Sequence, residues 1–200
     1  MLTACALAVG APASGEPGDA EAGRRKAEPC AACHGPGGNS VTPGTPSVSA
    51  MPVFYTHWQL IMFRDGRRRD PLMTPFVQNL TDEDLGDLSA YYAQQPATGR
   101  PAAIDAAKAA AGAPIAQAHH CTSCHGPQLM GQHPNVPRLA GQDFDYLLRR
   151  LRGDRTKTTS DLDGMMTMVS QSLTDEDIQN LVHFIAGLKP SGAPATPGAR

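Results

Sequence analysis

Polar and apolar positions follow a helical spacing in two segments that begin with the same letters. The string L-T-D-E-D occupies residues 80–84 and returns at residues 173–177. Its threonine can accept a hydrogen bond from a free backbone N–H group, and its carboxylates suit the positive end of a helix dipole. Apolar side chains then recur with the period of an amphipathic helix, namely Leu85, Leu88 and Tyr92 in the first segment and Ile178, Leu181, Phe184 and Ile185 in the second. The pattern predicts two capped helices related by an internal repeat.

The rest of the chain follows the same plan twice. Further helices are expected at residues 19–28, 53–63, 104–120 and 144–151, the third interrupted near residues 112–114, and an extended segment is expected at residues 71–80. The repeat therefore predicts two small domains joined by a linker. Their expected bounds are 19–96 for the first domain, 97–103 for the linker and 104–189 for the second domain, followed by a disordered tail at 190–200.

The composition limits what each half can bury. Aromatic residues make up only 5% of the chain, and a domain of about 100 residues or fewer struggles to bury enough apolar surface alone. A buried cofactor would supply the missing core. The formal net charge of -2 argues against a nucleic-acid partner. No stretch reaches the roughly 18 apolar residues of a membrane span.

Two cysteine motifs carry the candidate chemistry. C-A-A-C-H ends at His34 and C-T-S-C-H ends at His125, and both continue with Gly-Pro. C-x-x-C-H is the attachment signature of a c-type haem, because two thiols on one helical turn can form thioethers while the next His binds the iron. Zinc binding and dithiol chemistry are the alternatives, but neither pair has a local ligand set or a surrounding βαβ pattern. The motifs predict two covalently bound haem c groups, attached at Cys30 and Cys33 and at Cys121 and Cys124.

The repeat also selects a second ligand for each iron. Met73 and Met166 lie equally far before the two L-T-D-E-D strings. A thioether opposite the His is common in haem proteins that transfer electrons, and it raises the potential. Met165 and Met168 flank Met166, so they remain alternatives at the second iron.

Two prolines and one arginine are further candidates. Pro46 and Pro137 lie equally far after the motif histidines, and their carbonyls are expected to accept the second ring N–H of His34 and His125. One arginine of each half is expected to reach a haem propionate, since guanidinium groups pair well with carboxylates. Arg138 is a separate candidate for a propionate, with no counterpart in the first half.

The first 18 residues are expected to be an export leader. They are apolar and small, and A-P-A at residues 11–13 resembles a cleavage site, although no basic start precedes it. L-T-A-C at residues 2–5 resembles a bacterial lipobox, in which Cys5 would carry a lipid. A truncated signal and a lipobox both imply export. Because haem c is attached after export, we expect a periplasmic protein, with peripheral or lipid-anchored membrane association left open.

The order of these motifs resembles that of a class I cytochrome c domain. Two such domains in tandem are similar to the dihaem cytochrome c4 family over roughly residues 19–189, with C-H-G-P-G-G-N-S at 33–40 and P-R-L-A-G-Q at 137–142 among the matching strings. The resemblance implies an all-α fold of two domains, each wrapped round a covalent haem, with iron ligands His34 and Met73 in the first and His125 and Met166 in the second. One departure is V-S-A-M at residues 48–51, where the second half has L-A-G-Q.

The resemblance also implies a function. It predicts a periplasmic electron carrier whose irons cycle between ferric and ferrous states, between a respiratory donor and a terminal oxidase or another acceptor. The expected partners are redox proteins, such as a membrane oxidase or a dehydrogenase flavoprotein. No catalytic residues are expected, because a matched His and Met would close each iron. The alternatives are the cytochrome subunit of a periplasmic dehydrogenase, similar to the dihaem subunit of flavocytochrome c sulfide dehydrogenase, and a dihaem enzyme acting on a small sulfur substrate.

Overall fold

The computed structural model describes residues 18–191, except residues 101, 133, 160 and 162. The expected export leader, with Cys5, and nearly all of the expected tail at 190–200 lie outside the described residues. The α-helices of the described part are α1 Ala20–Lys26, α2 Ala31–His34, α3 Val53–Arg64, α4 Thr74–Val77, α5 Asp82–Ala93, α6 Ala106–Ala118, α7 Cys121–His125, α8 Phe144–Thr156, α9 Met165–Ser170 and α10 Asp175–Gly187. Two short 3₁₀ helices, Glu28–Cys30 and Pro36–Gly38, flank α2.

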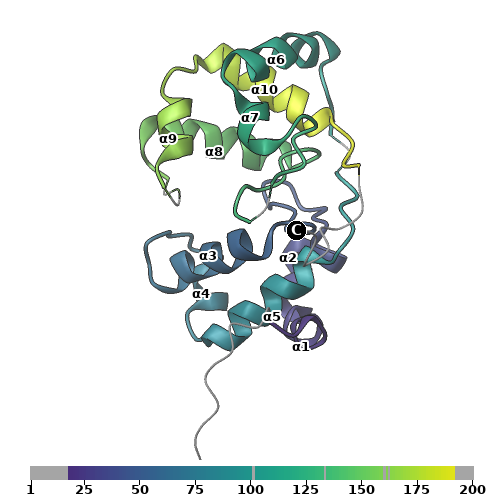
Figure 1. Ribbon diagram of the computed structural model, residues 1–200, viewed down its shortest axis with the longest axis vertical. Coiled ribbons are helices and arrows are strands. Elements are labelled where there is room, and N and C mark those ends of the chain that lie inside the picture. The colour runs from purple at the N-terminus through teal and green to yellow at the C-terminus, as the bar shows by residue number, and fades with distance from the viewer. Residues whose placement is uncertain (1–17, 101, 133, 160, 162, 192–200) are drawn as a thin grey trace, which may run out of the picture.

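The helices form two lobes (Figure 1). Helices α1–α5 make the lower lobe and α6–α10 the upper one, and the order of elements in the two lobes matches. The first helix of each lobe packs on the last, α1 on α5 and α6 on α10. Within the described residues no β-strand forms, apart from an isolated antiparallel bridge between Gln132 and Val136. The predicted all-α architecture is confirmed.

A glycine allows the close helix crossing in each lobe. A Cβ atom at Gly23 in α1 would lie 2.0 Å from the backbone oxygen of Asp87 in α5. A Cβ atom at Gly112 in α6 would lie 2.2 Å from the backbone oxygen of Asn180 in α10. Any larger residue would push the helices apart, because such distances are far below van der Waals contact. Residues 112–114 do not interrupt α6, contrary to the sequence prediction, and Pro114 lies inside the helix.

The two predicted helix caps form with the same geometry. Thr81 Oγ1 accepts the N–H of Asp84, and the Asp84 carboxylate accepts the N–H of Thr81, which completes a capping box at α5. Thr174 and Asp177 do the same at α10. This reciprocal arrangement satisfies two backbone donors at each helix start.

A matched arginine ties each cap to the preceding long helix. Arg64, at the end of α3, donates to the backbone oxygen of Leu80 at 3.3 Å and to Asp82 Oδ1 at 2.7 Å. Arg155, near the end of α8, donates to the backbone oxygen of Leu173 at 3.1 Å and to Asp175 Oδ1 at 2.6 Å. The recurrence of an arginine at this position in both lobes is therefore explained by its contacts with the following helix start.

The segments that carry the candidate methionines are more helical than predicted. The segment at 71–80, predicted to be extended, contains the one-turn helix α4 directly after Met73. In the second lobe, α8 continues to Thr156, five residues beyond its predicted end, and Met166 lies inside α9. The sequence signal was weak there because short helices depend on packing more than on local propensity.

Candidate haem sites

The two cysteine motifs lie on short helical turns. Cys30 ends a 3₁₀ turn and Cys33 lies in α2, whereas Cys121 and Cys124 both lie in α7. The first cysteine of each motif is half-buried and the second is exposed. Burial raises the pKa of the Cys30 and Cys121 thiols. Within the described residues no three Cys, His, Asp or Glu side chains gather as a metal site, so the cysteine pairs do not meet as a shared zinc site would require.

The two motif histidines have the same orientation. His34 Nδ1–H donates to the backbone oxygen of Pro46 at 2.8 Å, and His125 Nδ1–H donates to that of Pro137 at 2.8 Å. This bond fixes the tautomer and leaves Nε2 with its lone pair for a metal. Burial lowers the pKa of both imidazoles, which favours the neutral form that can bind iron.

In the first lobe, a thioether faces the free ring nitrogen. Met73 Sδ lies 3.4 Å from His34 Nε2. The Asp70 carboxylate holds the turn in front of α4, because its Oδ1 accepts the N–H of Leu72 at 2.9 Å and that of Met73 at 3.1 Å. The first lobe thus brings His34 and Met73 together.

In the second lobe, three neighbouring methionines differ in their exposure to solvent. Met165 and Met168 are exposed by 47% and 60%. Met166 lies between them on α9 and packs against the apolar core of the lobe. Of the three, Met166 is therefore the one whose side chain packs inward, which makes it the candidate ligand of the second lobe.

Arg138 is a buried cation without a carboxylate partner in the described part of the chain. Its side chain is fully buried. Nη1 donates to the backbone oxygen of Ala140, and Nη2 donates to that of Ser49 in the other lobe at 3.2 Å. Its Nε has no partner. Burial lowers its pKa to about 10. A buried guanidinium with a donor to spare fits an anion such as a haem propionate.

Comparisons with known proteins identify the family of this chain. The family model described as "Cytochrome c" matches residues 109–189, and "Cytochrome C oxidase, cbb3-type, subunit III" matches residues 19–91. Cytochrome c4 of Thiocapsa roseopersicina is 37% identical over 86% of this chain and 93% of its own length. The chain belongs to the cytochrome c4 family. The crystal structure of reduced recombinant cytochrome c4 from Pseudomonas stutzeri matches with a TM-score of 0.79 at 30% identity, over 86% of this chain and 99% of that one.

A further relative has a more specific name. The "Thiosulfate dehydrogenase electron acceptor" of Stutzerimonas stutzeri is 32% identical over 82% of this chain and 81% of its own length. Membership of the cytochrome c4 family makes the chain a dihaem class I cytochrome c and an electron carrier rather than an enzyme, with two covalently bound haem c groups. In the described part, no helix is both long enough and apolar enough to cross a bilayer.

This cytochrome c4 homologue also contains a pair of matched tyrosines that was not predicted from the sequence. Tyr55 on α3 and Tyr146 on α8 are spaced like Pro46 and Pro137, which was the signal that could have found them. Burial, together with the neighbouring Tyr146, raises the pKa of Tyr55. Arg68 Nη2 of the first lobe donates to Tyr146 Oη at 3.3 Å. The two lobes therefore meet through their long helices as well as through Arg138.

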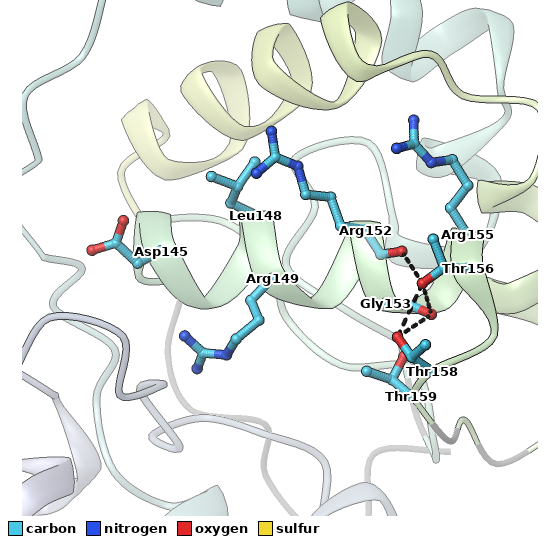
Figure 2. A pocket seen from close by; sticks show the side chains of 9 residues that line it. All are labelled: Asp145, Leu148, Arg149, Arg152, Gly153, Arg155, Thr156, Thr158 and Thr159. Atoms are coloured by element: carbon cyan, nitrogen blue, oxygen red, sulfur yellow. Dashed lines mark hydrogen bonds between the residues drawn. The ribbon is translucent and has the colours of Figure 1, made fainter.

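One pocket of this cytochrome lies away from the candidate haem residues. Its volume is about 430 Å³, and it is lined by Asp145, Leu148, Arg149, Arg152, Gly153, Arg155, Thr156, Thr158 and Thr159. Figure 2 shows Arg149 leaving α8 on the side opposite to Leu148 and Arg152, so the lining is spread round the helix. None of the motif cysteines, histidines or candidate methionines contributes to it.

Proposed function

We propose that this chain is a periplasmic electron carrier in which His34 and Met73 bind the first haem iron and His125 and Met166 bind the second. The observation that carries the proposal is the 3.4 Å approach of Met73 Sδ to His34 Nε2, with the Nδ1 atom of the ring held by Pro46. We also retain the domain bounds 19–96 and 104–189, with a linker at 97–103. The periplasmic location is supported by the covalent attachment of haem c, which follows export.

Each group of residues has a distinct task in this proposal. When bound, the haem supplies an iron that gains and loses one electron. The cysteines would hold it covalently, and the histidines and methionines would bind the iron, with the methionines favouring the ferrous state. Side chains of this chain would then occupy the positions at the iron that a substrate would need. Pro46 and Pro137 orient the histidines, and Arg138 neutralises a propionate.

We further propose that a dehydrogenase is one electron donor and that a terminal oxidase is one acceptor. The likeness to thiosulfate dehydrogenase electron acceptors in two organisms supports a dehydrogenase partner. Closed irons suit this relay, because an electron can enter at one haem and leave at the other without any bond being made to a substrate.

The ligands can be tested one at a time in the exported protein. The intact mass should exceed that of the polypeptide by two haems, and the near-infrared band of Met-ligated ferric haem should lose about half its intensity in Met73→Ala and in Met166→Ala. Met165→Ala and Met168→Ala are matched controls that should leave the band unchanged. Loss of the band in Met165→Ala or Met168→Ala, with none in Met166→Ala, would show that the second ligand is misassigned. Rapid carbon monoxide binding by the unmodified ferrous protein would contradict closed irons.

A further inference from the structure

A side chain of the second lobe forms two hydrogen bonds with the loop that follows Pro46 in the first lobe. Gln142 is buried, with 3% of its surface exposed, and so is Ser47, with 2%. The N–H of Ser47 donates to Gln142 Oε1 at 2.7 Å, and Gln142 Nε2 donates to the backbone oxygen of Ser47 at 2.8 Å. The amide of one lobe thus satisfies both backbone groups of one residue in the other.

The first of these bonds acts on a peptide group that also contacts a motif histidine. The N–H of Ser47 and the carbonyl of Pro46 belong to the same planar peptide unit. That carbonyl accepts Nδ1–H of His34 at 2.8 Å. A continuous chain of hydrogen bonds therefore runs from Gln142, through the Pro46–Ser47 peptide, to the imidazole of His34.

We propose that Gln142 is a positioning residue for His34, and that the second domain thereby lowers the reduction potential of the first haem. The inference rests on the proposed function in one respect, namely that His34 binds iron. Gln142 itself touches neither the haem nor His34 in this proposal. It acts through the peptide between them.

Two physical effects explain why the contact should lower, rather than raise, the reduction potential of the first haem. Hydrogen bonds in a chain polarise one another, so an acceptor on the N–H of Ser47 makes the Pro46 carbonyl more negative. A more negative carbonyl draws the Nδ1 proton of His34 and makes Nε2 a stronger donor. A stronger donor stabilises ferric iron more than ferrous iron, which lowers the potential. The paired bonds of Gln142 also hold the peptide plane in the orientation that His34 requires.

In the described part of the chain, no corresponding contact is found at the second haem site. Met51 occupies the position in the first half that matches Gln142 in the repeat, and it is buried, with 5% exposed. A thioether is at most a weak acceptor. The residue matching Ser47 is Arg138, whose side chain donates to the first lobe instead. We therefore expect the effect to act on the first haem alone.

Another hydrogen bond between the lobes, made by Arg149, provides the matched control. Arg149 Nη2 donates to the backbone oxygen of Gly44 at 2.7 Å, in the same loop as Ser47. Gly44 does not belong to the peptide that contacts His34. Arg149→Met should weaken the contact between the lobes without acting on that peptide, whereas Gln142→Met removes both bonds to Ser47.

The experiment compares the two variants in the full chain loaded with both haems. At a fixed solution potential near the midpoint, Gln142→Met should raise the ferrous-to-ferric ratio of the first haem by about threefold, a smaller change than the 10- to 100-fold loss of metal affinity or activity that follows direct removal of an outer partner. The second haem should be unchanged, as should both haems in Arg149→Met. The first haem is identified as the one that Met73→Ala perturbs. In ¹⁵N-histidine NMR of the ferrous protein, the Nδ1–H signal of His34 should shift in Gln142→Met, while that of His125 should not.

A conservative variant tests whether the acceptor is responsible. Gln142→Glu keeps an oxygen for the N–H of Ser47, so the ferrous-to-ferric ratio should return to the native value or fall below it. Equal shifts in Gln142→Met and Arg149→Met, equal shifts at both haems, or a Gln142→Glu variant that behaves like Gln142→Met would each overturn the proposal. Failure of the proposed function would be recognised separately, because the unmodified protein would then lack its first haem or its Met-ligation band.

Discussion

The two lobes share one order of helices, but different interactions hold their main helix crossings together. Where α1 meets α5, Lys26 Nζ lies 2.7 Å from Asp84 Oδ1 and 2.6 Å from Asp87 Oδ2, and the Asp87 side chain is only 4% exposed. Where α6 meets α10, the contact is mainly apolar. Among the described residues, the buried apolar side chains of the second lobe form one connected cluster of eleven. The first lobe buries ten, but only Ala27, Leu88 and Tyr92 join in a cluster, so its apolar core is more divided.

This difference shows that one backbone plan tolerates two kinds of stabilisation. Apolar burial contributes about 25 cal/mol per Å² and does not depend on pH. A buried ionic cluster must offset the cost of removing charges from water, and it weakens when one member is neutralised. The first lobe also receives side chains from the second at Ser47, Ser49 and Gly44. We therefore expect the first lobe to depend more on its haem, on its charges and on its neighbour.

The largest expected effect comes from removing one haem at a time. The double variants Cys30→Ala/Cys33→Ala and Cys121→Ala/Cys124→Ala should each retain one haem, as shown by intact mass. Without its haem, the first lobe should lose amide protection in α5 by more than about tenfold relative to the loss in α10 of the other variant, because its apolar core is divided and depends more on the cofactor to join its parts. Hydrogen exchange followed by mass spectrometry measures both helices. Equal or greater loss in α10 would show that the division of the core does not decide haem dependence.

A smaller effect is expected from breaking the ionic cluster. Lys26→Met leaves the buried Asp87 carboxylate without its cation, although the N–H of Asp19 still donates to it at 2.7 Å. The free energy of unfolding of the first lobe should fall by about 2 kcal/mol. Denaturant unfolding monitored at α1 and α5 by hydrogen exchange provides the measurement. The exposed Lys108 of α6 is the control, and Lys108→Met should change stability by less than about 0.5 kcal/mol. Similar losses in both variants would argue against a special role for the cluster.

Lowering the pH should destabilise the first lobe before the second, because the first depends more on its ionic cluster. Hydrogen bonds from the Lys26 side chain, and then from the backbone and the side chain of Thr81, lower the pKa of Asp84 from 3.8 to about 2. Because the folded-state pKa is depressed, this stabilisation is complete above about pH 4 and is lost as the pH falls towards 2, an effect of about 1–2 kcal/mol after allowance for partial exposure. The pKa of Asp177 in the second lobe is also lowered, first by its hydrogen bonds with Thr174, but without a lysine. Amide exchange in an acid series should show α5 opening at a higher pH than α10, and Asp84→Asn should reduce that difference.

The smallest expected effect comes from removing the helix caps, and it should lower the free energy of unfolding equally in both lobes. Thr81→Ala and Thr174→Ala each remove a cap of identical geometry, and each should cost about 1 kcal/mol. Equal changes in the unfolding free energy of the two lobes would confirm that the difference between them lies in the helix crossings. A cost in one lobe more than twice that in the other would instead place part of the difference at the caps.

Features that depend on local spacing could be predicted from the amino-acid sequence alone. The cysteine motifs, the repeated caps and the matched prolines and methionines all follow from residue type and separation along the chain, and they were sufficient to predict two haem domains. The starts of α5 and α10, capped by Thr81 and Thr174, were predictable because a cap is made by residues only three positions apart. The family assignment, reached from these strings, is confirmed by the relatives.

Features that depend on how distant segments meet could be identified only from the fold. The inward position of Met166 among its neighbours depends on the direction of α9, which packing sets. The bonds of Gln142 to Ser47 and of Arg138 to Ser49 join residues 95 and 89 positions apart. No local pattern predicts such pairs, because they form only once the two lobes have docked and water has been excluded from the loops between them.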